Sequence, residues 1–204
     1  MEERRIREVQ NEKKQLRARL RTLRRSLSQA AVEEKSRLIF TRLSTCLPFQ
    51  QAKTIVLYSA DENEVQTEAI WHEAVRQNKA VYYPRITPDK ANLQFVRRLP
   101  GQQLIPGMFG ILIPSGNDLL TGLSETDVVL TPGVGFDLSG HRLGRGKGYY
   151  DRAFRGVLAG ALRIALAYES QLVLAIPTAA NDEPVHFIAT ETRLIHCVGE
   201  FQRV

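Results

Sequence analysis

The feature that most constrains the fold of this chain is a series of short apolar runs separated by segments with helical periodicity. Residues 54–58 read TIVLY, and a continuous apolar run of this length is typical of a strand buried on both faces. Strands that alternate with helices favour a mostly parallel sheet flanked by helices. No repeat or linker interrupts the 204 residues, so we expect a single α/β domain over residues 1–204. The other predicted strands are residues 80–84, 93–96, 127–132, 163–168 and 185–190.

Four segments predict helices. Residues 3–25 are rich in Arg, Leu, Glu and Gln and contain neither Gly nor Pro, which favours one continuous helix. Ser28 is a good N-cap for a second helix, which we expect to continue until Pro48. The other two are expected to begin after Thr67 and at about Tyr149. The stretch from Pro100 to Thr126 is rich in Gly, Pro, Ser and Asn, and it predicts a loop that borders a cleft.

The positive charge of the chain is confined to its N-terminal segment. The formal net charge is +6, and residues 1–25 account for all of it with ten basic and four acidic side chains. Residues 26–204 hold 18 side chains of each sign. A positive chain favours a nucleic-acid partner, but a neutral body and the lack of aromatic residues in the basic segment weigh against one. We therefore expect no nucleic-acid partner, and we interpret residues 1–27 as a basic helix packed on the body.

A lysine interrupts the apolar stripe of this N-terminal helix. Lys13 stands where the spacing of three and four residues predicts an apolar side chain, and Arg17 lies beside it on the same face. If this face packs on the body, the two cations need a partner there. Alternatively, the lysine stem lies along the packed face while its ammonium reaches water. The apolar members of the stripe are Ile6, Val9, Leu16, Leu20, Leu23 and Leu27.

Three observations bear on the location of the protein. No apolar run approaches the length of about 18 residues that a membrane span needs, and the charged N-terminus lacks the apolar core of a signal peptide. Cys46 and Cys197 lie far apart without metal-type spacing, which predicts buried, reduced thiols. We therefore expect a cytoplasmic protein with no membrane partner, as a monomer or weak homo-oligomer.

The strongest chemical signal is a glycine-rich stretch directly after a predicted strand. Residues 131–151 read TPGVGFDLSGHRLGRGKGYYD, in which Gly144, Gly146 and Gly148 alternate with Arg145 and Lys147. Glycines let a backbone approach a ligand closely, and the cations between them meet anionic oxygens. The start of the helix that follows adds the positive end of its dipole. The pattern therefore predicts a phosphate site beyond the carboxyl end of a strand, where open α/β sheets bind ligands.

This glycine loop does not follow the common phosphate motifs. Counting back from the pair Gly146 and Lys147 places His141 where a Walker A loop has its first glycine, and the earlier glycines are too widely spaced for a dinucleotide fingerprint. Asp151 follows the loop in the first turn of the predicted helix. From its spacing alone it is either a magnesium ligand or a charge that favours the helix N-terminus. Asp182 is a second candidate carboxylate.

Residues 135–154, GFDLSGHRLGRGKGYYDRAF, closely resemble the signature of the 5-formyltetrahydrofolate cyclo-ligase family, also called methenyltetrahydrofolate synthetases. Weaker likenesses follow in the family's order over nearly the whole chain. The resemblance implies a single α/β domain related to sugar-phosphate isomerases and CoA transferases. The weaker likenesses are Lys13-x-x-Leu16-Arg17, residues 24–28, 64–67 and 83–85, Gly110 to Pro114, residues 171–173, Ile176-Pro177 and Asp182.

The activity implied by this resemblance is the ATP- and magnesium-dependent conversion of 5-formyltetrahydrofolate to 5,10-methenyltetrahydrofolate, with release of ADP and phosphate. The formyl oxygen is phosphorylated first, N10 of the folate then attacks, and phosphate leaves. Positioning and charge stabilisation dominate phosphoryl transfer of this kind. The resemblance therefore implies Mg²⁺ as cofactor, ATP as co-substrate and a reduced folate as substrate.

The resemblance also implies roles for particular residues. The catalytic residues would be Lys147 and Arg145, nearest the transferred phosphoryl group, while Asp151 and Asp182 would hold magnesium. Glu64 would accept hydrogen bonds from the N–H donors of the pterin. The implied ATP-binding residues are Lys13, Arg17, Arg142, Leu143, Gly144, Arg145, Gly146, Lys147, Gly148, Tyr149 and Tyr150. The implied folate-binding residues are Ser59, Glu64, Arg145, Gly146, Lys147, Gly148 and Tyr149.

Two alternative functions agree with parts of the pattern. A sugar-phosphate isomerase of the same fold would need a phosphate site and an acid/base carboxylate, but no nucleotide. A nucleic-acid-binding protein would use the basic helix, and its affinity would fall steeply with salt. Binding of ATP with magnesium, without binding of sugar phosphates, would favour the cyclo-ligase over the isomerase.

Overall fold

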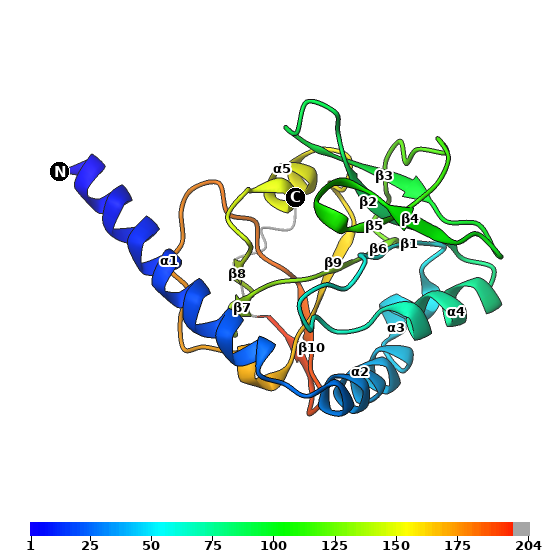
Figure 1. Ribbon diagram of the computed structural model, residues 1–204, viewed down its shortest axis with the longest axis horizontal. Coiled ribbons are helices and arrows are strands. Elements are labelled where there is room, and N and C mark those ends of the chain that lie inside the picture. The colour runs from blue at the N-terminus through cyan, green and yellow to red at the C-terminus, as the bar shows by residue number, and fades with distance from the viewer. Residues whose placement is uncertain (198–204) are drawn as a thin grey trace.

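Seven strands form the central sheet of the computed structural model, which describes residues 1–197 apart from the side chains of residues 2, 3, 5 and 6 (Figure 1). In chain order they are β1 (Thr54–Val56), β2 (Ala80–Ile86), β3 (Leu93–Arg97), β6 (Val128–Thr131), β9 (Leu162–Leu166), β10 (Phe187–Ala189) and β11 (Leu194–His196). Their order across the sheet is β11-β10-β9-β6-β1-β2-β3. The inner pairs are parallel, and β3 and β11 add antiparallel edges. The predicted α/β class, with a mostly parallel sheet, is confirmed.

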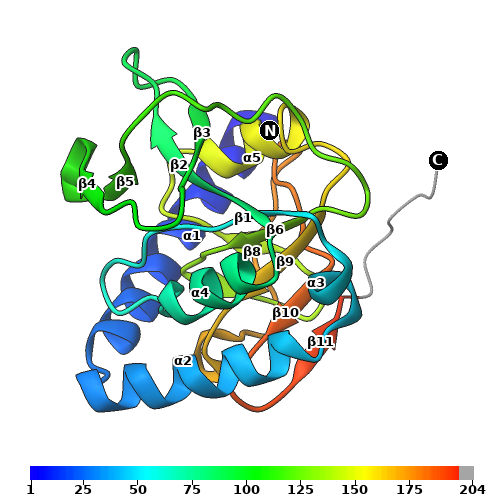
Figure 2. The same ribbon diagram turned by 90° about the vertical axis from the view of Figure 1, so that its right-hand side faces the viewer.

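Helices cover both faces of this sheet (Figure 2). Ile55 on one side of β1 packs among residues of α2, α3 and α4, while its neighbour Val56 packs on the other side among residues of α5. Both side chains are fully buried, as the continuous apolar run predicted. The helices are α1 (Glu2–Arg25), α2 (Gln29–Ser44), α3 (Leu47–Gln51), α4 (Glu68–Arg76) and α5 (Tyr149–Arg155).

The helix boundaries differ from the prediction at Pro48. The Ser28 hydroxyl oxygen accepts a hydrogen bond from the Ala31 N–H at 3.2 Å and caps α2 as expected. However, α2 ends at Ser44, and Pro48 lies in the first turn of a separate helix, α3. Proline fits there because the first turn of a helix leaves its N–H groups unpaired in any case. Pro48 therefore starts a helix and does not stop one.

The stretch from Pro100 to Thr126 is more ordered than a loop. It contains a hairpin of β4 (Leu104–Pro106) and β5 (Leu112–Pro114), joined by a 3-10 turn at Met108–Gly110. These strands are three residues long and carry prolines, so no periodicity reveals them. A second short hairpin, β7 (Gly135–Phe136) and β8 (Arg142–Leu143), leads into the glycine loop.

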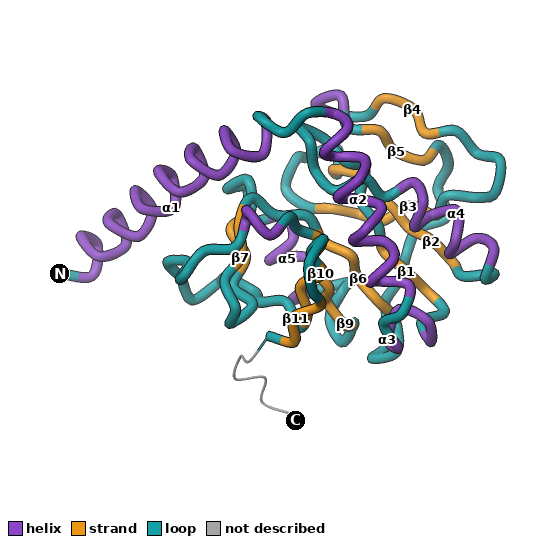
Figure 3. The backbone as a smooth tube through the Cα atoms, turned by 90° about the horizontal axis from the view of Figure 1, so that it is seen from below, coloured by secondary structure: helices purple, strands orange, loops and turns teal. Residues whose placement is uncertain are grey.

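Helix α1 lies along the body with its C-terminal half and projects beyond it with its first turns (Figures 1 and 3). Leu20 is buried against Val134, Leu143 and Ile176. The predicted stripe is wrong at Leu23, which is 45% exposed while Arg24 is buried in its place, but its last member, Leu27, packs against the core as predicted. The predicted stripe member Ile6 has its side chain outside the described residues.

Two further expectations concern cysteines and membranes. Cys46 and Cys197 are both buried and free, as predicted. Burial raises the pKa of Cys197 to about 12, so its thiol stays protonated. Within residues 1–197, no helix combines the length and the apolar character that crossing a bilayer requires.

Candidate active site

A cavity of about 730 Å³ lies beyond the carboxyl ends of β1 and β6. All fifteen predicted site residues line it, although they come from four separate parts of the chain. Their convergence is the observation that defines the candidate site, and their individual roles stay predictions. They are Lys13 and Arg17 from α1, Ser59 and Glu64 from the loop after β1, residues 142–151 between β8 and α5, and Asp182 from the loop before β10.

The glycine loop takes a conformation that requires glycine. Gly146 has φ +100° and Gly148 has φ +64°, both in the left-handed region that side chains with a Cβ rarely adopt. Gly148 is also the residue from which α5 begins. Arg17 on α1 donates from Nε to the carbonyl oxygen of Gly144 at 2.8 Å, so the N-terminal helix directly contacts the loop. The loop and α1 together form one wall of the cavity.

Lys13 is paired inside the cavity. Its side chain is only 5% exposed, and its ammonium forms an ion pair with the Asp182 carboxylate. The alternative in which the ammonium reaches water is therefore wrong. Asp182 also accepts the Ala179 N–H at 2.7 Å, which fixes the carboxylate on its own loop. This pair connects α1 with the segment before β10.

The second predicted metal carboxylate, Asp151, lines the same cavity as Asp182. Its Oδ1 accepts hydrogen bonds from Arg142 Nη2 at 2.8 Å and from the Glu183 N–H at 3.3 Å, so Asp151 contacts the residue that follows Asp182. No three metal-binding side chains cluster anywhere in the described part of the chain. Magnesium needs only one or two carboxylates when phosphate oxygens and waters complete its shell, so two carboxylates suffice in number, and the role of Asp151 and Asp182 as magnesium ligands stays a prediction.

Glu64 also lines the cavity and is nearly buried. Arg145 donates from Nη2 to Glu64 Oε1 at 2.9 Å and from Nη1 to Asp61 Oδ2 at 2.8 Å. Burial raises the pKa of Glu64 above its ordinary value, although Arg145 and Arg24 act against this. Burial alone would lower the pKa of Arg145, but Glu64 and Asp61 raise it above the ordinary arginine value. This end of the cavity thus holds an ion pair between two predicted site residues.

Lys147 differs from the other cations of the cavity. Its side chain is exposed and lines the cavity. Among the residues that the structure describes, no carboxylate pairs with its ammonium. Lys13, Arg142 and Arg145 are each neutralised by an aspartate or glutamate. Arg17 and Arg85 also line the cavity, and each donates to a backbone carbonyl oxygen. Among the described cations of the cavity, Lys147 is therefore the one that an anionic ligand meets without displacing another partner.

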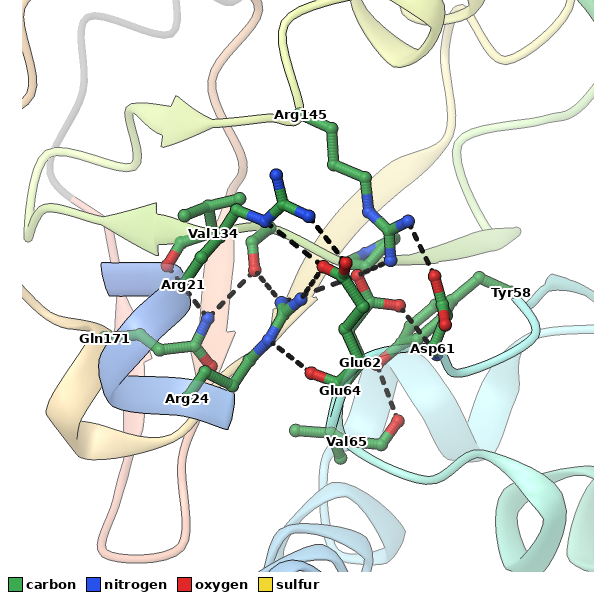
Figure 4. A network of polar contacts seen from close by, with 12 residues as sticks. Arg21, Arg24, Tyr58, Asp61, Glu62, Glu64, Val65, Val134, Arg145 and Gln171 are labelled. Carbon is green, nitrogen blue, oxygen red and sulfur yellow. Dashed lines mark hydrogen bonds and ion pairs between the residues drawn. The ribbon is translucent and has the colours of Figure 1, made fainter. Parts of the chain in front are cut away.

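A second layer of charged residues lies beneath Glu64, and the sequence pattern did not predict it (Figure 4). Arg24 on α1 lies within 3.4 Å of Glu64, and Glu62 accepts hydrogen bonds from Arg21 and Arg25. One signal was available, because Arg24 follows Lys13 by three helical turns and so lies on the same face. The apolar stripe predicts that Leu23, and not Arg24, is the buried residue of this turn.

Apolar residues from the β4–β5 hairpin complete the cavity, so the predicted position of this stretch at a cleft is confirmed. Met108, Phe109, Ile111 and Ile113 line it, and Phe109 is 75% exposed with φ +58°. Ser59 donates from its hydroxyl to the Leu112 carbonyl oxygen, which connects the loop after β1 with this hairpin. The cavity thus combines a cationic wall with an apolar one.

Comparison with known proteins agrees with this geometry. The model of the 5-formyltetrahydrofolate cyclo-ligase family matches residues 9–191. This chain belongs to that family. Like the relatives named 5-formyltetrahydrofolate cyclo-ligase, this chain is an enzyme of the ligase class.

Three relatives show how far the likeness extends. The 5-formyltetrahydrofolate cyclo-ligase of Haemophilus influenzae is 33% identical, over 85% of this chain and 94% of its own length. The one from Escherichia coli K12 is 31% identical, over 86% and 98%. The solved 5,10-methenyltetrahydrofolate synthetase of Aquifex aeolicus is 29% identical, with a TM-score of 0.78 over 91% of this chain and 93% of that one. The cyclo-ligase likeness therefore covers both the sequence and the fold.

Proposed function

We propose that this cyclo-ligase family member converts 5-formyltetrahydrofolate to 5,10-methenyltetrahydrofolate, with ATP as co-substrate and ADP and phosphate as products. The observation that supports this most directly is the convergence of all fifteen predicted residues on one cavity. The exposed ammonium of Lys147 and the glycine loop favour a phosphate ligand, and the nearly buried carboxylate of Glu64 favours a ligand with N–H donors.

The triphosphate of ATP would lie along the wall formed by α1 and the glycine loop. Lys13, Arg17 and Lys147 supply positive charge on this side of the cavity. The start of α5 adds partial positive charge through its unpaired N–H groups. Asp151 and Asp182 would hold magnesium, which supplies charge neutralisation of the phosphates when it is bound. These residues thus account for binding and orienting the transferred group.

The pterin of the folate would lie against Glu64. A carboxylate accepts hydrogen bonds from the amino group and ring N–H of a pterin, and the apolar wall from the β4–β5 hairpin suits the aromatic remainder of the folate. Arg145 bridges the two ends of the cavity, because it contacts Glu64 while lying in the glycine loop. This arrangement would bring the formyl oxygen close to the γ-phosphate.

The reaction then needs two displacements. The formyl oxygen attacks the γ-phosphorus, the bond to the bridging oxygen breaks, and ADP leaves. N10 next attacks the formyl carbon, the carbon–oxygen bond breaks to release phosphate, and N10 loses its proton. Lys147 and Arg145 would stabilise negative charge on the transferred group in both steps. The carbon atom ends bonded to both nitrogens in the new ring.

The test is to mix the protein with 5-formyltetrahydrofolate, ATP and Mg²⁺ and to follow the near-ultraviolet absorbance of the methenyl product. We expect the signal to require both ATP and Mg²⁺. A matched control replaces 5-formyltetrahydrofolate with a sugar phosphate, for which we expect no ATP consumption. A folded protein that yields no ATP-dependent methenyl product would overturn the proposed function.

A further inference from the structure

Arg24 is the most completely buried charged side chain near the cavity. It is 1% exposed, yet it lies on α1, a helix whose other basic residues are mostly exposed. A buried guanidinium is costly unless several acceptors surround it. Arg24 does not line the cavity, so a direct contact with a ligand does not explain its burial. Its contacts beneath the cavity therefore need an explanation.

These contacts join three parts of the site. Arg24 Nη1 donates to the Gly133 carbonyl oxygen at 3.1 Å and lies 3.4 Å from Glu64 Oε1. Its Nε donates to the Glu62 carbonyl oxygen at 3.0 Å. Gly133 lines the cavity after β6, and Glu64 lines it after β1. Arg24 thus connects α1 with the loops that follow two neighbouring strands of the sheet.

The loop that carries Glu64 is held in an unusual conformation by the same end of α1. Glu62 has φ +50° and Asn63 has φ +58°, a left-handed conformation that is uncommon for residues other than glycine, although asparagine tolerates it better than glutamate. The Asn63 side chain donates to the Leu27 carbonyl oxygen at 2.9 Å and to those of Arg24 and Arg25 at 3.4 Å and 3.3 Å. The end of α1 therefore determines where this loop, and with it Glu64, is placed.

We propose that Arg24 is a positioning residue for the folate end of the site, because it holds the Glu64 carboxylate in place from below while Arg145 contacts it from the cavity side. This inference rests on the proposed function. Glu64 Oε1 faces both cations, and its Oε2 accepts the Asp61 N–H at 3.2 Å. Arg145 is also expected to meet the transferred phosphoryl group. When Arg145 contacts the phosphoryl group, Glu64 still has Arg24 as a cationic partner, which a buried carboxylate requires.

Two side-chain changes separate this role from a general effect on stability. Arg24→Gln removes the cation, and Arg24→Lys keeps the charge without the planar fork of donors. The matched control is Arg25→Gln, because Arg25 contacts Glu62 from the same turn of α1 but is 56% exposed and does not contact Glu64. After thermal unfolding has shown that each protein folds, steady-state assays measure its kcat and its KM values for the folate and for ATP.

We expect Arg24→Gln to raise the folate KM by about tenfold or more, which is the scale of losing one charged contact in a buried site. The ATP KM should change by less than about twofold, and Arg24→Lys should lie between Arg24→Gln and the wild type. Arg25→Gln should resemble the wild type. An equal rise in the two KM values, or an unchanged folate KM in both Arg24 variants, would overturn the proposal.

A double-mutant cycle tests whether Arg24 acts through Glu64. In a Glu64→Gln background, Arg24→Gln should raise the folate KM by less than about twofold, because the carboxylate that it positions is gone. The same tenfold rise in both backgrounds would contradict the proposal and indicate a structural role. If Arg24→Gln does not fold, the cycle is run with Arg24→Lys and the same two outcomes decide.

A second readout is the pH dependence of the folate KM. Arg24 is one of the two cations that lower the pKa of Glu64 against the effect of burial. In Arg24→Gln, the midpoint of the pH dependence of the folate KM should therefore move to higher pH. An unmoved midpoint contradicts the proposal. The charged and titratable groups that face Glu64 are Arg24, Arg145, Asp61, Glu62, Tyr58, Tyr150 and Tyr168.

Binding without turnover separates this proposal from the proposed function. Titration of 5-formyltetrahydrofolate into ATP-free protein, followed by calorimetry, should show weaker binding for Arg24→Gln than for Arg25→Gln. A wild type that binds the folate but forms no methenyl product overturns the proposed function alone. A wild type that is active, with Arg24→Gln binding the folate as tightly, overturns the role of Arg24 alone.

Discussion

Cations and carboxylates meet in pairs around the cavity. Lys13 pairs with Asp182, and Arg142 pairs with Asp151, so each predicted metal carboxylate is held by a predicted phosphate-binding cation. Charges that are partly removed from water in this way are stable only with such partners. Arg17 and Arg85, which also line the cavity, donate to carbonyl oxygens instead, and only Lys147 among these cations has neither kind of partner within the described residues.

The first residue-scale prediction concerns Lys147. Lys147→Ala should lower kcat by about 10² or more, because it removes one preorganised charge from the developing negative charge of the transition state. The free energy of unfolding should stay nearly unchanged, since the side chain is exposed. Steady-state kinetics with the methenyl absorbance assay measure kcat. Near-wild-type turnover would reject the role given to Lys147.

The second residue-scale prediction is a pH dependence that originates at Glu64. Burial raises its pKa, so the carboxylate takes up a proton at a higher pH than an ordinary glutamate does. The protonated group accepts pterin N–H donors poorly, so the folate KM should rise as the pH falls through that pKa. A Glu64→Gln variant should have a high folate KM without this dependence. Identical pH profiles for the two proteins would assign the titration to another group.

The sequence predicts site residues well where they belong to a motif, and poorly where tertiary packing determines whether a side chain is buried. The glycine loop and Glu64 were placed at one cavity by their likeness to a family pattern. The spacing of α1 could not decide whether Lys13 reaches water, because its partner Asp182 lies 169 residues away in sequence. The burial of Arg24 is not predictable from spacing, because a buried arginine depends on acceptors that only the folded chain supplies.

At the scale of elements, α1 is a wall of the site as well as a basic helix. Leu20 anchors it against Val134, Leu143 and Ile176. A Cβ added at Gly135 would lie 2.4 Å from Leu20 Cδ1, so the glycine at the start of β7 allows the helix to approach this closely. The helix thereby brings Lys13 and Arg17 to the cavity.

The element-scale prediction compares two leucines of α1. Leu20→Ala should lower the free energy of unfolding by about 2–4 kcal/mol, because it leaves a cavity where the helix packs. Leu23→Ala should change it by less than about 1 kcal/mol, since Leu23 is 45% exposed. Denaturant unfolding of both variants measures the difference. Equal losses would show that α1 packs in another rotation about its axis.

Elements with strong periodicity were predictable, and short ones were not. The run at residues 54–58 predicted β1 and its burial on both faces. The β4–β5 hairpin was not predicted, because three-residue strands with prolines depend on pairing with each other. Local sequence does not decide the role of Pro48, because proline both ends and begins helices, and the choice depends on the chain that follows.

At the scale of the whole molecule, the sheet brings distant segments of the chain together. The loops after β1 and β6 leave the same edge of the sheet, because these neighbouring strands are parallel. Residues 142–151 and the loop before β10 meet there, and α1 closes one side. The α/β class was predictable from the alternation of elements, whereas the strand order was not specified by local sequence.

The whole-molecule prediction concerns ligand-induced stability. A ligand that binds only the folded protein stabilises it by about 2.7 kcal/mol at 100 times its Kd. ATP with Mg²⁺ and 5-formyltetrahydrofolate should each raise the Tm, whereas sugar phosphates should not. Thermal unfolding monitored by circular dichroism measures these shifts. A rise with a sugar phosphate and none with ATP would favour the isomerase alternative.

Phosphoryl transfer to the formyl oxygen is the proposed step that drives ring closure in this cavity. Isotope labelling can follow this transfer. The protein is given 5-formyltetrahydrofolate that carries ¹⁸O in the formyl group, together with ATP and Mg²⁺, and the released phosphate is analysed by mass spectrometry. We expect one labelled oxygen in each phosphate and one phosphate for each methenyl product. Methenyl product accompanied by unlabelled phosphate would contradict the transfer.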